Sequence, residues 1–111
     1  MKVYVSGKIT GLDQKEYLEK FEAAQKYLEL HGHKVMNPAS AMFTCTAGFG
    51  AEEYLHVCYA MIDVCDVIYM LDNWQSSQGA RKELQYASDW RKRIVYQDDR
   101  TQELGFPVVY A

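Results

Sequence analysis

The stretch DVIYMLDNWQSSQGARKELQYA, residues 66–87, decides the fold that this sequence predicts. It opens with the apolar run VIYML, which is typical of a buried parallel strand. A polar break at 72–79 follows, and then a helical pattern with Ala80, Leu84 and Ala87 on its core-facing side. A strand that leads through a loop into a helix places backbone N–H groups at the carboxyl edge of a sheet. Open α/β sheets bind anions and small ligands at that edge.

Glu83 is the unusual residue of this helix. Its neighbours three and four positions away are Gly79, Ala80, Tyr86 and Ala87, so no cation within the helix can pair with it. A carboxylate on a face of small residues, one turn into such a helix, indicates a cleft at the sheet edge. The alternative is an unpaired glutamate on a surface helix, which is common in proteins.

The rest of the chain alternates between strand and helix patterns. Strands are expected at residues 2–6, 33–36, 67–71 and 92–96, and the helices between them at 13–31, at 52–65 and around Glu83. Asp13 is expected to cap the first helix, with Glu16 as its capping-box partner. This alternation predicts a small doubly wound α/β fold, Rossmann-like or flavodoxin-like, with about four parallel strands in the order 2-1-3-4. We expect a single domain over 1–111, in which 97–111 form a C-terminal tail.

The composition limits the classes of function. The chain has 111 residues, of which 49% are hydrophobic and 24% charged, as in an ordinary globular protein. A net charge of −3 argues against binding to a nucleic-acid polymer, and no apolar run approaches the roughly 20 residues of a membrane span. The three cysteines have neither disulfide nor zinc-site spacing. We therefore expect reduced, mostly buried thiols in a cytoplasmic protein that uses no metal or other cofactor.

The loop GKITG at 7–11 is a second candidate for ligand binding. Its glycines let backbone N–H groups approach a phosphate, with Lys8 supplying charge and Thr10 a hydroxyl. It fits neither the Walker pattern nor the dinucleotide fingerprint, and most short glycine loops are only turns. In the strand order 2-1-3-4, however, this loop and the turn at 77–83 face each other at the topological switch point. The glycine loop and the turn before Glu83 therefore both indicate a ligand site at the switch point.

Three motifs in this order resemble the superfamily of nucleoside 2-deoxyribosyltransferases and 2'-deoxynucleoside 5'-phosphate N-hydrolases. They are YVSGKITG at 4–11, the aspartate Asp66 that opens the third strand, and S-x-G-x-x-x-E at Ser77, Gly79 and Glu83. The run DVIYMLDNWQSSQGARKE is also similar to a small family of uncharacterised bacterial and phage proteins placed beside them. The resemblance covers residues 2 to about 96 and leaves the tail outside it.

The resemblance implies an N-glycosidic hydrolase or transferase that acts on a nucleoside monophosphate, in the first place a 2'-deoxy one. In the family, the glutamate of the last motif attacks C1' of the sugar and forms a glycosyl-enzyme intermediate, and Glu83 matches it. An aspartate helps to protonate or orient the leaving base. Asp66 is the closest match, with Asp63 and Asp72 as rivals. Ser77 stands where transferases of free nucleosides carry an aspartate, which favours a substrate with a 5'-phosphate.

The predicted site thus combines two catalytic residues, Glu83 and Asp66, with a set of substrate-binding residues. The binding residues are Gly7, Lys8, Ile9, Thr10, Gly11, Asp63, Asp72, Trp74, Ser77 and Gly79. Trp74 is expected to stack on the base or to wall the pocket. The loop at 39–51 is expected to act as a lid, with Phe43 and Phe49 as its hydrophobic wall.

The expected partner is a nucleoside monophosphate or related nucleotide, bound by a homo-oligomer. Family sites borrow a side chain from a neighbouring subunit, for which the tail segment 106–110 is a candidate. Arg81 and Lys82 depart from the small or aromatic residues that the enzymes carry before the glutamate. Two alternatives therefore stay open: a non-catalytic module that binds or sequesters a nucleotide, and an α/β scaffold with a vestigial site and only a protein partner.

Overall fold

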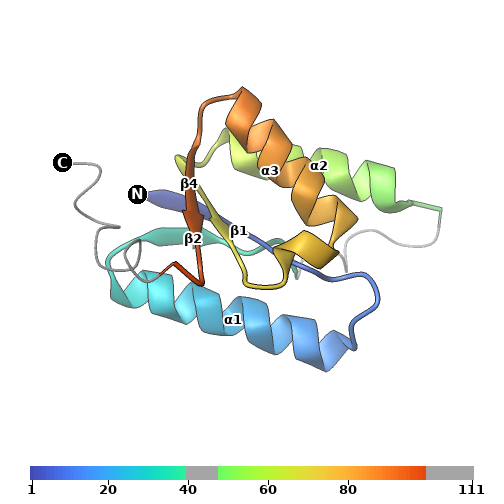
Figure 1. Ribbon diagram of the computed structural model, residues 1–111, viewed down its shortest axis with the longest axis horizontal. Helices are drawn as coiled ribbons and strands as arrows, with labels where there is room; N and C mark the ends of the chain where they lie inside the picture. The colour runs from blue at the N-terminus through green and yellow to red at the C-terminus, as the bar shows by residue number, and fades with distance from the viewer. Residues whose placement is uncertain (40–47, 100–111) are drawn as a thin grey trace.

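The computed structural model describes residues 1–39 and 48–99, and it places a parallel sheet between two layers of helices (Figure 1). Within the described residues, the sheet has four strands in the order β2-β1-β3-β4. They are β1 (Lys2–Ser6), β2 (Lys34–Met36), β3 (Val67–Met70) and β4 (Arg93–Tyr96). All three pairings are parallel. The predicted fold class and strand order are confirmed.

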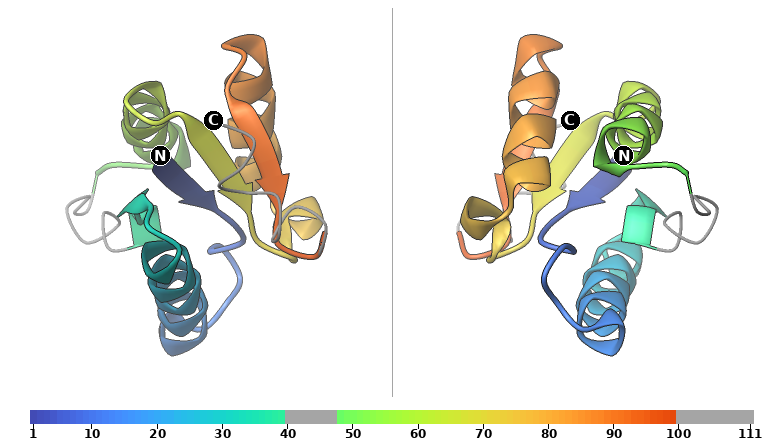
Figure 2. Two further views of the ribbon diagram at one scale, coloured as in Figure 1. Left: turned by 90° about the vertical axis from the view of Figure 1, so that its left-hand side faces the viewer. Right: turned by 90° about the vertical axis from the view of Figure 1, so that its right-hand side faces the viewer.

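Each face of the sheet has its own helices and its own core (Figure 2). Helix α1 (Gln14–Leu30) covers one face, and helices α2 (Ala51–Asp63) and α3 (Gln78–Asp89) cover the other. A short 3-10 helix, η2 (Trp74–Ser76), joins β3 to α3. Successive residues of a strand point to opposite faces, so Val3 and Val5 of β1 pack with α1, whereas Tyr4 packs with α2 and α3. Ser6 shares the parity of Tyr4 and therefore faces α2 and α3.

Helix α1 packs as its apolar spacing predicts. Its buried residues recur every three or four positions: Tyr17, Phe21, Ala24 and Leu28. Gly32 follows the helix with a φ of 86°, a left-handed conformation in which glycine carries no Cβ penalty. Asp13 occupies the N-cap position, but its side chain makes no capping hydrogen bond. The predicted capping box with Glu16 is therefore not formed.

Helix α3 differs from its predicted pattern at one position. Ala80 and Ala87 are buried as expected, but the third buried residue is Glu83, and Leu84 is only half-buried. The helix is thus rotated about its axis so that a carboxylate, not a leucine, lies at the centre of its packed face. A buried carboxylate needs hydrogen-bond partners from other elements.

The other predictions are tested only within the described residues. Cys58 and Cys65 are buried free thiols, as expected, whereas Cys45 lies outside the described residues. Most of the expected lid at 39–51, including Phe43, also lies outside the described residues. Phe49, which is described, is 60% exposed. Residues 100–111 of the tail are likewise not described. Among the helices that are described, none is long and apolar enough to span a membrane.

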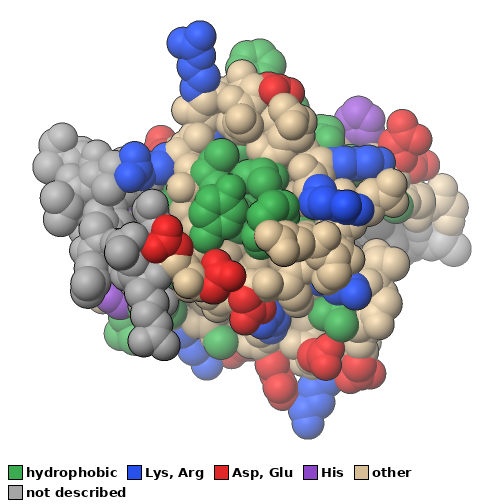
Figure 3. Space-filling model, viewed as in Figure 1, with side chains coloured by type: hydrophobic (Ala, Val, Ile, Leu, Met, Phe, Trp, Pro, Cys, Tyr) green, Lys and Arg blue, Asp and Glu red, His purple; other side chains and the backbone are tan. Residues whose placement is uncertain are grey.

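The edge strand β4 leaves apolar surface in contact with solvent. Figure 3 shows hydrophobic side chains gathered between β4 and α3 on this side of the molecule. Ile94 and Tyr96 of β4 are half-buried against the core that faces α2 and α3. A partly exposed apolar surface beside an edge strand is compatible with a homo-oligomer, which stays a prediction.

Candidate functional site

The carboxyl ends of β1 and β3 lie next to each other at the centre of the sheet. Ser6 and Met70 are partners in the ladder, and the Leu71 N–H donates a 2.8 Å hydrogen bond to the Ser6 carbonyl oxygen. This contact brings the start of the glycine loop against β3. A Cβ at Gly7 would lie 2.6 Å from Leu71 Cδ1 and 2.9 Å from Leu71 Cβ, closer than van der Waals contact allows. Packing alone therefore requires a glycine at position 7.

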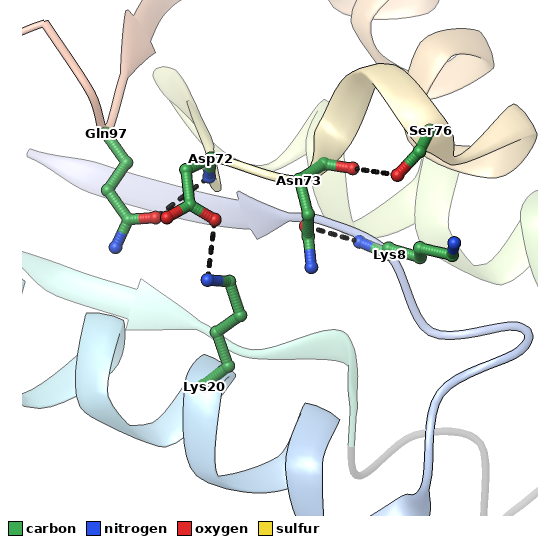
Figure 4. Close-up of polar contacts among 6 residues, drawn as sticks. All are labelled: Lys8, Lys20, Asp72, Asn73, Ser76 and Gln97. Carbon is green, nitrogen blue, oxygen red and sulfur yellow. Dashed lines mark hydrogen bonds and ion pairs between the residues drawn. The ribbon is translucent and has the colours of Figure 1, made fainter.

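The glycine loop is fastened to the turn after β3 by one side chain. The Lys8 N–H donates a 3.0 Å hydrogen bond to Asn73 Oδ1 (Figure 4). The Lys8 amide is thus already bonded within the protein, and an approach of the other loop amides to a phosphate stays a prediction. Ile9 packs against the core beside α1, Thr10 is exposed, and Gly11 has a left-handed φ of 88°. The Thr10 hydroxyl and the Lys8 side chain remain as candidate ligand contacts.

Asp72 links three elements at the same edge. Its carboxylate pairs with Lys20 Nζ of α1 at 2.6 Å, and its N–H donates a 2.9 Å hydrogen bond to Gln97 Oε1 after β4 (Figure 4). Lys20 belongs to the helix that covers the face of the sheet opposite Glu83. These partners give Asp72 a structural role between α1, β3 and β4.

Glu83 lies on the other face of the sheet and is nearly enclosed. Its side chain is 8% exposed, and its Oε1 accepts a 2.6 Å hydrogen bond from the fully buried Ser6 Oγ. Within residues 1–39 and 48–99, no ion pair to Glu83 is present. The expectation that the carboxylate has no cation partner within its helix is confirmed, and its main partner comes from β1. The second turn of α3 and the end of β1 are therefore joined at the buried carboxylate.

The surroundings of Glu83 change its proton affinity. Burial raises the pKa of Glu83 to about 7, because removal from water disfavours the charged form. The hydrogen bond from Ser6, and after it the nearby Cys58 thiol and Tyr4 hydroxyl, act in the opposite direction and lower the pKa in part. Near neutral pH the protonated and ionised forms are therefore both populated. A carboxyl group with such a pKa at a sheet edge is a candidate for chemistry.

The start of α3 combines a capped helix end with open space. Ser77 is the N-cap, and its Oγ accepts a 3.1 Å hydrogen bond from the Ala80 N–H. Gly79 is exposed, and the only atom near a Cβ placed there is Ser77 Oγ at 3.9 Å, an ordinary contact. Packing within the described residues thus does not require this glycine, although glycine weakens a helix relative to alanine. The missing side chain leaves room for a ligand at the N-terminus of α3.

Asp66 and Asp63 lie at the opposite edge of the sheet. Asp66 precedes β3, and its Oδ2 accepts a 3.0 Å hydrogen bond from the N–H of Lys2, the first residue of β1. Asp63, the last residue of α2, accepts a 2.6 Å hydrogen bond from the Tyr86 hydroxyl. Since Glu83 contacts the last residue of β1, the length of that strand, roughly 13 Å, separates it from Asp66. This placement separates Asp66 from the glutamate that it was expected to assist, whereas a role of Asp63 towards the substrate stays a prediction.

Trp74 lies on the same side of the sheet as Glu83. It is half-buried against the core that faces α2 and α3, and its ring is tilted against Tyr96 with 5.8 Å between centroids. This contact fixes the connection between β3 and α3. Whether Trp74 stacks on a base stays a prediction.

Four residues of this site were not predicted as site residues. Ser6 and Asn73 make hydrogen bonds there, and Tyr4 and Cys58 lie in the buried cluster on the Glu83 side of the sheet. The alternation of β1 carried a signal for two of them, because it places Tyr4 and Ser6 on one face and Ser6 is a polar residue at the end of an apolar strand. Cys58 and Asn73 had no such signal, since their partners are distant in the sequence.

The fold is shared with an enzyme of known structure. The chain resembles the structure of Clostridium botulinum CMP N-glycosidase, BcmB, with a TM-score of 0.58 and 18% sequence identity. The match covers 98% of this chain and 82% of that chain. At this identity the likeness establishes the α/β architecture. No curated protein sequence matches the chain.

A family model covers most of the chain. The model described as "Domain of unknown function (DUF4406)" matches residues 1–96, which include every described strand and helix. The match also includes Ser6, Ser77 and Glu83, and it ends with β4. The chain therefore belongs to the DUF4406 family.

Proposed function

We propose that this protein cleaves the N-glycosidic bond of a nucleoside monophosphate, with Glu83 as the nucleophile. The observation that carries the proposal is the buried Glu83 carboxylate, held by Ser6 beside the central strands and without an ion-pair partner among the described residues. An ion pair would reduce the nucleophilicity of such a group. The shared fold with a CMP N-glycosidase supports the same class of reaction.

The reaction would use the carboxylate oxygen of Glu83 that the Ser6 hydroxyl does not bond. Ser6 Oγ bonds Oε1 of Glu83, so Oε2 is the oxygen that would attack C1' of the sugar. As the new C–O bond forms, the C1'–N bond breaks, and the base leaves with that electron pair and takes a proton from water. Water then attacks the glycosyl ester, which releases the sugar phosphate and a proton and restores the carboxylate. Another base in place of this water would make the reaction a transfer.

The start of α3 supplies the features that a 5'-phosphate needs. The N-terminus of a helix attracts anions through its unpaired N–H groups and its dipole. Ser77 introduces no negative charge at this position, and Gly79 leaves open space beside it. The Lys8 ammonium group, which has no ion pair within the described residues, would add a positive charge from the glycine loop. These features favour a nucleotide over a free nucleoside.

The experiment is an incubation of the purified protein with nucleosides and with nucleoside monophosphates, each in the ribose and the 2'-deoxyribose form. Release of free base is followed by chromatography, and the covalent intermediate by mass spectrometry of acid-quenched protein. Glu83→Gln keeps the size of the side chain but removes the nucleophile. Glu19→Gln makes the same change on the exposed face of α1 and serves as the matched control.

We expect the unaltered protein and Glu19→Gln to release base from at least one monophosphate, and Glu83→Gln to release none. Base release that persists in Glu83→Gln would contradict the role of this residue. No release from any nucleotide, together with stabilisation against heat by a monophosphate, would instead indicate a non-catalytic nucleotide-binding module, since a ligand that binds only the folded state stabilises it.

A further inference from the structure

The side chain of Asn73 contacts a distant loop instead of the short helix that it begins. Asn73 occupies the N-cap position of η2, where an asparagine side chain commonly accepts a hydrogen bond from the first turn, but it makes no such bond here. Its Oδ1 accepts instead from the N–H of Lys8, 65 positions earlier in the chain (Figure 4). The turn itself is closed by Ser76, whose Oγ donates a 3.0 Å hydrogen bond to the Asn73 carbonyl oxygen. The Asn73 side chain is thus used to join two separate segments.

This hydrogen bond lies where β1 and β3 diverge. The strand ladder ends with the pair Ser6 and Met70, and the Leu71 N–H still reaches the Ser6 carbonyl oxygen. Two residues beyond Ser6, a side chain replaces the backbone as the partner, because Asn73 accepts from the Lys8 N–H. Among the described residues, this is the last hydrogen bond between the glycine loop and the segment that follows β3.

The side chain that begins at this fixed amide carries an unpaired charge. Lys8 is half-buried, and it forms no ion pair within residues 1–39 and 48–99. A Cβ placed at Gly11 would lie 3.9 Å from Lys8 Cε, so the lysine side chain lies alongside the far end of its own loop. Lysine side chains are usually well exposed, and a partly covered ammonium group without a carboxylate partner is suited to bind an anion.

We propose that Asn73 is a positioning residue for the 5'-phosphate, because it holds Lys8 in place and so sets the preference of the site for a nucleotide over a free nucleoside. This inference rests on the proposed function, in which Lys8 and the start of α3 receive the phosphate. Asn73 is attached to both sides of that site, since η2 leads directly into α3. Without this bond the loop would spend less time in the position that binds phosphate, and the apparent affinity would fall in proportion.

The test compares Asn73→Ala with Gln97→Ala on the monophosphate that the protein cleaves and on the corresponding nucleoside. Gln97 is the matched control, because its Oε1 accepts a 2.9 Å hydrogen bond from the N–H of Asp72, the residue before Asn73, without contacting the glycine loop. Loss of one hydrogen bond should raise KM for the monophosphate about fivefold in Asn73→Ala and leave kcat unchanged. The kcat/KM for the nucleoside, or its inhibition constant if it is not cleaved, should not change. Gln97→Ala should alter neither substrate.

A second readout does not depend on catalysis. Exchange of the Lys8 amide hydrogen, followed by NMR in the protein without ligand, reports the bond itself. Asn73→Ala should accelerate this exchange about fivefold, whereas the amides within β1 should exchange as before. Asn73→Asp retains an oxygen that can accept the bond, so it should keep the exchange slow. Gln97→Ala should have no effect at Lys8.

The outcomes separate this inference from the proposed function. If no variant releases base, but calorimetry shows that Asn73→Ala and not Gln97→Ala weakens binding of a monophosphate about fivefold, the proposed function fails and the positioning role stands. Equal losses for nucleotide and nucleoside would overturn the positioning role. Faster exchange at Lys8 with an unchanged KM or dissociation constant would overturn it as well. A protein that binds no monophosphate would contradict both.

Discussion

The buried carboxyl group of Glu83 allows a quantitative prediction of how the free energy of unfolding depends on pH. Its pKa is about 7 in the folded protein, against a usual value of 4.5. The folded state therefore binds a proton at Glu83 that the unfolded chain releases between these two pH values. The stabilisation by this group is fully present below pH 4.5 and is lost as the pH rises through 7. A shift of this size corresponds to about 3 kcal/mol of the free energy of unfolding.

Glu83→Gln tests this reasoning, because the amide resembles the protonated carboxyl group and does not ionise. The Ser6 hydroxyl can still donate to the side-chain oxygen of the amide. We expect the two proteins to have similar stability near pH 4.5. By pH 8 the variant should be the more stable by about 3 kcal/mol, because only the unaltered protein must bury a charged carboxylate. Loss of catalytic activity would accompany this gain in stability.

The measurement is urea denaturation at a series of pH values from 4.5 to 8, followed by circular dichroism. The difference between the two proteins isolates Glu83, since other titrating groups such as His33 contribute equally to both. The free energy of unfolding of Glu19→Gln, a change on the exposed face of α1, should vary with pH in the same way as that of the unaltered protein. A difference between Glu83→Gln and the unaltered protein that stays constant over this range would show that Glu83 does not titrate there, and the argument from burial would be refuted.

Three further predictions concern substitutions to or from glycine at single positions. Gly7→Ala should lower the free energy of unfolding by about 1–3 kcal/mol, because its Cβ would overlap Leu71; an unchanged melting temperature would contradict the close approach. Gly79→Ala should raise stability by about 0.5 kcal/mol through its helix propensity but raise KM for the nucleotide, and an unaltered KM would argue against a ligand at the start of α3. Arg91 follows α3 with a φ of 58°, so Arg91→Gly should stabilise the protein by about 1 kcal/mol in urea denaturation; a loss of stability would indicate that the arginine side chain outweighs the strain of its backbone.

The fold could be predicted because its signals are local. The apolar run at 67–71 and the spacing of Tyr17, Phe21, Ala24 and Leu28 reflect the periods of a strand and a helix, which neighbouring residues set. The strand order then follows from the short right-handed connections of an α/β fold. The same local reasoning identified Glu83 as a carboxylate without a cation partner in its own helix.

The environment of Glu83 depends on contacts that local patterns do not contain. The predicted topology already put Asp66, which opens the third strand, at the amino edge of the sheet, and only the resemblance assigned it a role beside the glutamate. The sequence could not show that Asn73 fastens the glycine loop or that Asp72 pairs with Lys20, since these partners are 65 and 52 positions apart. The raised pKa of Glu83 arises in the same way, from burial between β1, α2 and α3. The sequence by itself determined the strands and helices and identified Glu83 as a carboxylate without a cation partner in its helix. Only the tertiary structure decided its partners and its proton affinity, because both depend on which distant side chains the packed sheet and helices bring together.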